Sequence, residues 1–196
     1  GISIDGKQVA QTAASKGQIH LLRFLFEQRL LLSPSDKNGV QPIHEAAAWG
    51  KINIMEYYTS LGMSIETPMQ STGKEKEINK LWIGSTPIFS ASMKSTVEAV
   101  KWLLDHQANP RITLDSGLNI LQAAIYNEPG NCLEILRLFQ EHFLTSNIKQ
   151  ILPAVSLAIS KDYIEPIKLF YQMGIPIDTN LEHGFTGMHL ACYHGA

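Results

Sequence analysis

Three residues near the end of the chain have side chains that bind transition metals. His189, Cys192 and His194 form an H-x-x-C-x-H cluster, and imidazole and thiolate groups are the usual ligands of zinc. A structural zinc site needs four ligands, and no fourth candidate lies nearby in the sequence. We therefore expect neither a metal site nor a bound cofactor.

A second motif suggests phosphate binding. Residues 69–75 read MQSTGKE, with a Gly-Lys pair after Ser-Thr. A phosphate-binding loop requires a glycine five residues before Gly73, where Pro68 stands, and a serine or threonine after Lys74, where Glu75 stands. We interpret the segment as a solvated loop.

The remaining candidates for catalysis are a cysteine and scattered carboxylates. Cys132 opens a predicted helix, a position that can lower a thiol pKa, but the histidine that would orient it is distant. We prefer to interpret Cys132 as a small core residue. Carboxylates such as Glu98 and Glu134 recur at one or two per segment, as expected for charge on a helix surface rather than for a paired acid and base. The sequence therefore predicts no catalytic residues and no enzymatic activity.

Composition indicates a folded, soluble chain from a reducing environment. Of its 196 residues 44% are hydrophobic, the formal net charge is -2, and 17% of the residues are charged. No basic run exceeds two residues, so we expect neither nucleic acid nor a membrane surface as a partner. The two cysteines are too few for a disulfide framework, and no stretch resembles a membrane span or a secretory signal. We expect a cytoplasmic monomer.

An internal repeat organises the chain. Residues 8–17 (QVAQTAASKG) align without a gap with residues 41–50 (QPIHEAAAWG), 33 residues further on. Four further copies begin at Thr86, Asn119, Leu152 and Thr186. A longer apolar segment follows each of the first five copies, at residues 19–28, 52–62, 96–106, 132–142 and 163–174. Because apolar residues recur there at i, i+3, i+4 and i+7, each unit is predicted to pair a short helix with a longer amphipathic helix.

This unit resembles the ankyrin repeat. The Gly-x-Thr-Pro-Leu-His-x-Ala-Ala signature of that family is close in residues 39–47 (GVQPIHEAA), 84–91 (GSTPIFSA) and 184–191 (GFTGMHLA). The resemblance covers residues 3–196 and implies an all-α solenoid of stacked helix-turn-helix units with hairpin loops. We divide the single array 1–196 into units at about 3–35, 36–80, 81–113, 114–146, 147–180 and an incomplete unit at 181–196. We expect the natural polypeptide to continue beyond Ala196.

The resemblance assigns roles to small and polar residues of the short helices. Because each short helix is pressed between two neighbouring units, one position in it must be small, and it holds Ala13, Ala46, Ala91, Ala124 and Ala191. His44 and His189 occupy the family's histidine position, whose imidazole ties the helix to a neighbouring loop. Cys192 falls on an inward-facing small position, which argues further against a metal site with His189.

The resemblance also implies a concave groove lined by the exposed side of the short helices. The candidate partner-binding residues there are Trp49, Met93, Lys94, Tyr126, Asn127 and Tyr193. Large aromatic side chains on a rigid scaffold are typical binding hot spots. Two alternatives stay open: Trp49 folds back over its own helix pair, and Tyr126 packs under the insertion at 127–131.

The connection at residues 63–84 is longer than the period requires. Its middle is highly charged, whereas its return arm, Leu81 to Ile83, is apolar and suited to a strand. We expect a β-hairpin finger with Trp82, a further candidate partner-binding residue, near its base. Long loops in compact arrays are either functional or disordered, so both partner contact and mobile decoration stay open.

The function expected is that of a non-catalytic module that binds a partner protein through the groove and the enlarged loop. The alternative is a targeting segment of a larger multidomain enzyme or of a host-directed bacterial effector, whose active domain lies outside this chain. The effector would act in the host cytosol. Units that depart this far from consensus resemble the ankyrin proteins of intracellular bacteria or protists.

Overall fold

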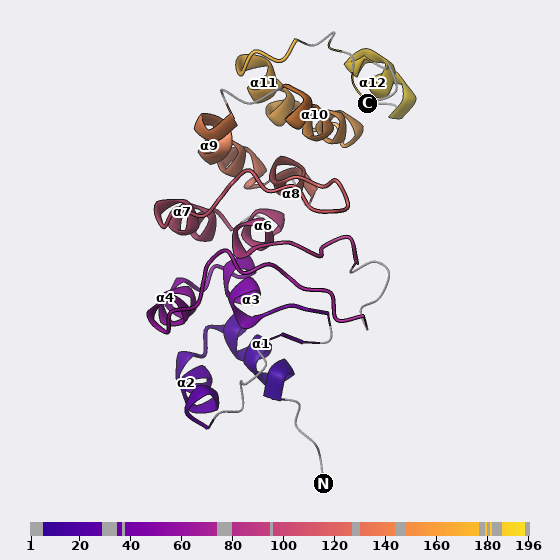
Figure 1. Cartoon of the computed structure of the whole chain (residues 1–196). Coiled ribbons are helices and arrows are strands. Elements are labelled where there is room, and N and C mark those ends of the chain that lie inside the picture. Colours follow the sequence, from indigo (N-terminus) through magenta and orange to yellow (C-terminus); the bar gives the residue numbers. More distant parts are fainter. Residues whose placement is uncertain are drawn as a thin grey trace.

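The computed structural model describes residues 6–28, 35–36, 38–73, 80–94, 96–126, 130–143, 148–176, 179, 181 and 186–194. Helices in these ranges stack in two rows (Figure 1). The inner row holds α1 (Gly6–Lys16), α3 (Pro42–Ala48), α6 (Pro87–Met93), α8 (Ile120–Tyr126), α10 (Leu152–Ser160) and α12 (Gly187–His194). The outer row holds α2 (Ile19–Glu27), α4 (Ile52–Ser60), α7 (Val97–Asp105), α9 (Cys132–Phe143) and α11 (Ile164–Gln172), and a 3-10 turn, η1 (Ile148–Gln150), precedes α10.

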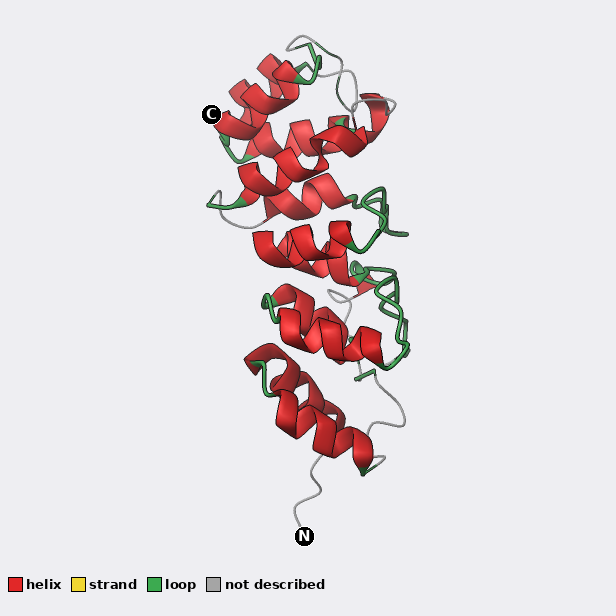
Figure 2. Cartoon of the chain, turned by 90° about the vertical axis from the view of Figure 1, so that its left-hand side faces the viewer, coloured by secondary structure: helices red, strands yellow, loops and turns green. Residues whose placement is uncertain are grey.

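The described helices form a single file, as the all-α solenoid predicts. Substantial contacts run within one helix pair or between consecutive pairs, and the connections between pairs emerge on one side of the stack (Figure 2). Each pair therefore buries its apolar faces against its neighbours rather than in a common centre. No described helix is long and apolar enough to cross a membrane.

Local sequence explains where the inner helices begin and end. Pro42, Pro87 and Pro153 stand in the first turn of α3, α6 and α10, where a missing N–H costs nothing. After the inner helix the chain turns through a left-handed residue, as at Gly50 with φ 64°. Asp162 takes this place after α10 with φ 56°, which an aspartate tolerates better than most side chains.

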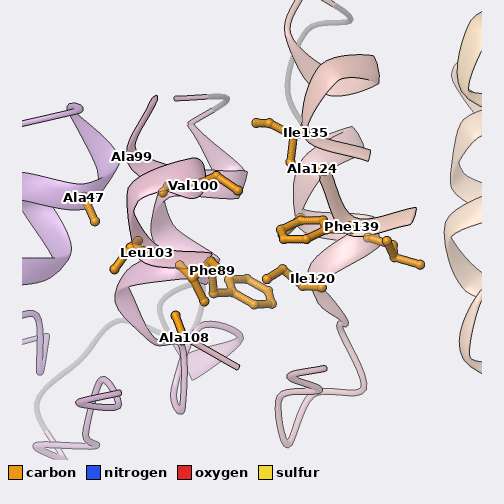
Figure 3. Packing of buried hydrophobic residues seen from close by; sticks show 14 of the residues in the cluster. Ala47, Phe89, Ala99, Val100, Leu103, Ala108, Ile120, Ala124, Ile135 and Phe139 are labelled. Atoms are coloured by element: carbon orange, nitrogen blue, oxygen red, sulfur yellow. The ribbon is translucent and has the colours of Figure 1, made fainter. Parts of the chain in front are cut away.

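The core consists of small residues in the inner row and large residues between the rows. Four of the five predicted small positions are fully buried, and the fifth, Ala191, has a side chain outside the described part. Phe139 lies beside Ala124, Phe89 lies beside Ile120, and both rings are buried (Figure 3). Small residues between helices allow their backbones to approach.

Side chains link consecutive pairs. The ring of buried His44 accepts a hydrogen bond at Nδ1 from Gln41 N (3.1 Å), and its Nε2 lies 3.1 Å from the carbonyl oxygen of Ser85. With Nδ1 as acceptor, Nε2 carries the proton and donates a hydrogen bond to the Ser85 carbonyl oxygen. Asn119 provides a similar link further along, donating from Nδ2 to Gln150 O at 2.9 Å. The role expected for His44 is confirmed.

The enlarged connection is closed at its base by backbone hydrogen bonds. Met69 N donates to Ser85 O, and Gly84 N donates to Met69 O, both at 2.8 Å. The strand predicted for the return arm is wrong: residues 81–84 form turns, with Ile83 N bonded to Lys80 O. Trp82, in the middle of this segment, packs against Phe89 and Tyr126 instead of pairing within a strand. Residues 74–79, the middle of the predicted finger, lie outside the described residues.

Candidate protein-interaction surface

Four of the residues predicted for partner binding converge on one pocket between α3 and α6. Trp49, Trp82, Met93 and Lys94 line this hollow, whose volume is about 170 Å³ and which we call the anchor pocket. The rest of its lining is Asn38, Val40, His44, Glu45, Ala48, Met69, Ser85, Phe89 and Ser90. Residues from two neighbouring helix pairs and from the base of the enlarged connection thus meet at one place.

Three kinds of local structure position these side chains. The inner helices α3 and α6 pack side by side, and they carry Glu45 and Met93 respectively. Trp49 and Lys94 are the residues directly after these helices, at their C-caps. Trp82 comes from the turn that closes the enlarged connection, so the pocket exists only because that connection folds back onto α6.

Trp49 combines the two interpretations that its sequence left open. Its Nε1 donates a hydrogen bond of 3.1 Å to Oε2 of Glu45, one turn earlier in the same helix. The indole does fold back over α3, yet 53% of the residue stays exposed. The ammonium group of Lys94 lies 5.8 Å from the centre of the indole ring, a distance typical of a cation–π contact. The ring is therefore held in place while part of it faces solvent.

The ionisable groups of the pocket differ in their roles. Burial lowers the pKa of His44 to about 4, so the imidazole is neutral at pH 7 and serves the link to Ser85. Burial also raises the pKa of Glu45, and the charge of Asp36 adds to this effect, while the hydrogen bond from Trp49 and the charge of Lys94 act in the opposite direction. Glu45 and Lys94 therefore give the pocket one acidic and one basic side chain that influence each other.

Tyr126 stands apart from the anchor pocket but touches its wall. The Tyr126 and Trp82 rings meet edge to face, with centroids 5.3 Å apart and planes at 86°. Lys161 approaches the same tyrosine, with Nζ 5.8 Å from the ring centre, and donates a 2.8 Å hydrogen bond to the Tyr126 carbonyl oxygen. Trp82 thus joins the pocket to Tyr126, which is still 43% exposed. Asn127 and most of the insertion beside it lie outside the described residues.

Comparison with known proteins settles the family. The model for ankyrin repeats in many copies matches residues 10–57 and 74–137, more than half of the chain. The chain belongs to the ankyrin-repeat family. Ankyrin repeats are typical protein-interaction modules, in agreement with the aromatic pocket on the inner row.

Solved structures agree with this assignment of the fold. One match is a chain in the structure of a predatory endopeptidase from Bdellovibrio bacteriovorus in complex with an immunity protein. The TM-score is 0.66 and the sequence identity 18%, over 95% of the ankyrin-repeat chain described here and 91% of that chain. At this identity the likeness extends to the fold alone.

The last inner helix of the ankyrin array carries the remaining predicted site residue and the predicted metal ligands. Tyr193 is 83% exposed and does not line the anchor pocket. Cys192 is exposed rather than inward-facing, and among the described helices the substantial contacts of α12 are with α10. His189 caps its own helix at Thr186, with Nδ1 2.8 Å from the threonine oxygen, and the side chain of His194 is not described.

Within the described residues no three histidine, cysteine or acidic side chains are grouped as metal ligands. Cys132 is buried at the start of α9, and its burial raises the pKa of the thiol. A buried, protonated thiol is unreactive. The interpretation of Cys132 as a core residue is confirmed.

Sequence analysis did not predict a second apolar pocket. It has a volume of about 230 Å³ and lies where α10, α11 and α12 meet, lined in part by Phe170, Tyr171 and Met188. Tyr171 and Met188 are also exposed. The signal that could have found it is a large apolar residue at a surface position of α11, although single residues of this kind are common on protein surfaces.

Proposed function

We propose that this ankyrin-repeat chain is a non-catalytic module that binds a partner protein, with the anchor pocket as the centre of its binding surface. One observation carries the proposal: Trp49, Trp82, Met93 and Lys94, which the sequence places in three separate segments, line one pocket. Binding energy in protein interfaces concentrates in such pockets, where a few aromatic and basic residues surround a buried anchor.

The rigidity of the surroundings supports this role. Trp49 is fixed by Glu45 and Lys94, and Trp82 is fixed by Tyr126. Side chains already held in place lose little conformational entropy when a partner docks, so more of the contact energy appears as affinity. The fold is also found in a structure of an endopeptidase bound to an immunity protein, a protein–protein complex.

The proposal extends to the enlarged connection at 63–84. Its base forms one wall of the pocket through Met69 and Trp82, and Ser116 Oγ donates a 2.9 Å hydrogen bond to Leu81 O. A partner seated in the pocket would contact this base directly. We further propose that the array acts as a monomer divided into the six units given above. Recruitment for a larger enzyme or effector would use the same surface.

Capture experiments with matched variants test the proposal. Trp49→Ala removes a pocket wall, and Phe24→Ala removes an equally exposed aromatic residue, also 53% exposed, from outer helix α2. Proteins bound by the immobilised chain are quantified by mass spectrometry, and affinity for the most enriched one is then measured with purified components. We expect Trp49→Ala to weaken binding at least tenfold, about 1.4 kcal/mol, and Phe24→Ala to leave it unchanged.

Circular dichroism and thermal melting of both variants provide the folding control. Wild-type affinity in a folded Trp49→Ala variant, repeated with Met93→Ala, would place the partner elsewhere and contradict the proposal.

A further inference from the structure

The anchor pocket contains a hydrogen-bond acceptor that the fold leaves in part unused. Oε2 of Glu45 accepts the hydrogen bond from Trp49 Nε1. Among the described residues no donor is found for the second oxygen, Oε1, and Glu45 has no salt bridge. A partly buried carboxylate gains from a further donor because water reaches it less freely than at the surface. The pocket therefore favours a ligand that brings an N–H or O–H group.

The charges around the pocket select against ionic ligands. A cationic side chain that approaches Glu45 also approaches Lys94, which acts electrostatically on Glu45 and whose ammonium group lies over Trp49. The charge of Asp36 also acts on Glu45, but Asp36 does not line the pocket, and its carboxylate already accepts hydrogen bonds from Asn38 N and Val40 N. An anionic side chain that approaches Lys94 meets the carboxylate of Glu45. Like charges brought together in this way oppose binding. A neutral donor meets neither penalty.

The remaining walls select for an aromatic body. Trp49, Trp82 and Phe89 offer ring surfaces, and Met69 and Met93 offer polarizable thioethers. Aromatic rings pack favourably against both. A volume of about 170 Å³ suits a single side chain rather than a whole helix. Tyrosine and tryptophan are the side chains that combine one large ring system with one neutral donor.

We propose that the anchor pocket binds a tyrosine or tryptophan side chain of the partner protein, with its ring against Trp49 and the two methionines and its O–H or N–H donated to Glu45. This inference rests on the proposed function and names the chemistry of the anchor. Tyrosine and tryptophan are also the residues most enriched at binding hot spots, which tend to pair with hot spots on the partner.

Capped peptides Gly-Ser-X-Ser-Gly, with X as tyrosine, tryptophan, phenylalanine, lysine or glutamate, test the inference on the whole chain. Binding is followed by the methyl resonances of Met69 and Met93 in NMR spectra of protein labelled with 13C-methyl methionine. We expect the tyrosine and tryptophan peptides each to bind about fivefold more tightly than the phenylalanine peptide, because phenylalanine lacks the donor that both of them supply. The lysine and glutamate peptides should bind more weakly than any of these.

A set of carboxylate variants tests whether Glu45 accepts the hydrogen bond that the peptide donates. Glu45→Leu should abolish the preference for tyrosine over phenylalanine, Glu45→Gln should keep part of it through its amide oxygen, and Glu98→Leu, which removes an exposed carboxylate of α7, should keep all of it. If Glu45→Leu does not fold, the inference is tested by the ratio of the affinities of the tyrosine and phenylalanine peptides for the wild-type protein.

The outcomes separate this inference from the proposed function. Equal binding of the tyrosine and phenylalanine peptides, a preference that survives Glu45→Leu, or tightest binding by lysine or glutamate would overturn the inference and leave the pocket as a docking site. If no peptide shifts either methyl resonance, the inference and the pocket-centred part of the proposed function both fail.

Discussion

His44 and Ser85 are 41 residues apart in the sequence, and the imidazole Nε2 of the first lies 3.1 Å from the carbonyl oxygen of the second. This contact ties α3 to the segment that leads into α6, in the wall of the anchor pocket. A protonated imidazole would no longer accept the hydrogen bond from Gln41 N. The protonation state of the His44 imidazole therefore affects both the stability of the array and the shape of its binding surface.

Acid should destabilise the array through His44. Burial lowers the pKa of this imidazole from 6.5 to about 4 in the folded state. Above pH 6.5 the imidazole of His44 is neutral in both the folded and the unfolded state, and its contribution to stability is fully present. Between pH 6.5 and 4 only the unfolded state binds the proton, so the free energy of unfolding falls as the pH falls. The expected loss is about 3 kcal/mol by pH 4. Urea unfolding at several pH values measures it.

His44→Gln is the matched control for this pH dependence, because glutamine offers a similar donor and acceptor without titrating. The glutamine variant should lack the part of the pH dependence of unfolding free energy that His44 contributes. Parallel pH profiles of the two proteins would rule out His44 as the titrating group.

Thr86 and Thr96 should respond oppositely to replacement by valine. The Thr86 hydroxyl is buried and has no hydrogen-bond partner among the described residues, since the position three residues later holds Phe89, where α3 and α12 have a histidine. The Thr96 hydroxyl lies 3.0 Å from Ala47 O. Thr86→Val should leave the free energy of unfolding unchanged or raise it by up to about 1 kcal/mol, and Thr96→Val should lower it by about 1 kcal/mol. Chemical denaturation of both variants gives the comparison, which an equal loss would contradict.

Gly39 should tolerate alanine far less than Gly62 does. Both have left-handed backbones, with φ 78° and 79°. A Cβ at Gly39 would lie 1.7 Å from Gln70 O, whereas one at Gly62 meets nothing within 4 Å. Gly62→Ala should cost about 1 kcal/mol for its backbone alone, and Gly39→Ala should cost clearly more because Gln70 must move. Thermal melting of the two variants measures the difference; similar melting temperatures would show that the connection shifts freely.

Trp82 and Tyr126 should be energetically coupled. Their edge-to-face contact joins the base of the enlarged connection to α8. In a double-mutant cycle with Trp82→Ala and Tyr126→Ala, the interaction energy from the unfolding free energies should be about 0.5 to 1.5 kcal/mol. A cycle of Trp82→Ala, in the turn at 81–84, with Phe24→Ala, on α2 of the first helix pair, is the control and should be additive. Additivity in the first cycle would mean that the rings touch without stabilising each other.

Local patterns were sufficient to predict the helices and their stacking. The 33-residue period, the prolines at the first turns and the buried alanines each reflect contacts within a unit or with its neighbour, so they recur in the sequence. His44 could be predicted for the same reason.

The predictions failed where residues from irregular segments determine the structure. The turn at 81–84 depends on Trp82 packing against Phe89 and Tyr126, contacts that no periodicity encodes. The partnership of Trp49 with Glu45 is local, but its place in a pocket depends on the folded connection. The prediction for Cys192 was wrong because the repeat pattern places a neighbouring unit on both sides of the helix, whereas among the described helices the substantial contacts of α12 are with α10.

The closed base of the enlarged connection has a mechanical consequence. A solenoid pulled from its two ends carries the load through each interface in series, so the weakest interface opens first. Between α3 and α8, however, Met69, Leu81 and Trp82 add hydrogen bonds and a ring contact that bridge more than one interface. Under tension the terminal helix pairs should peel away first, while the segment that carries the anchor pocket keeps its shape.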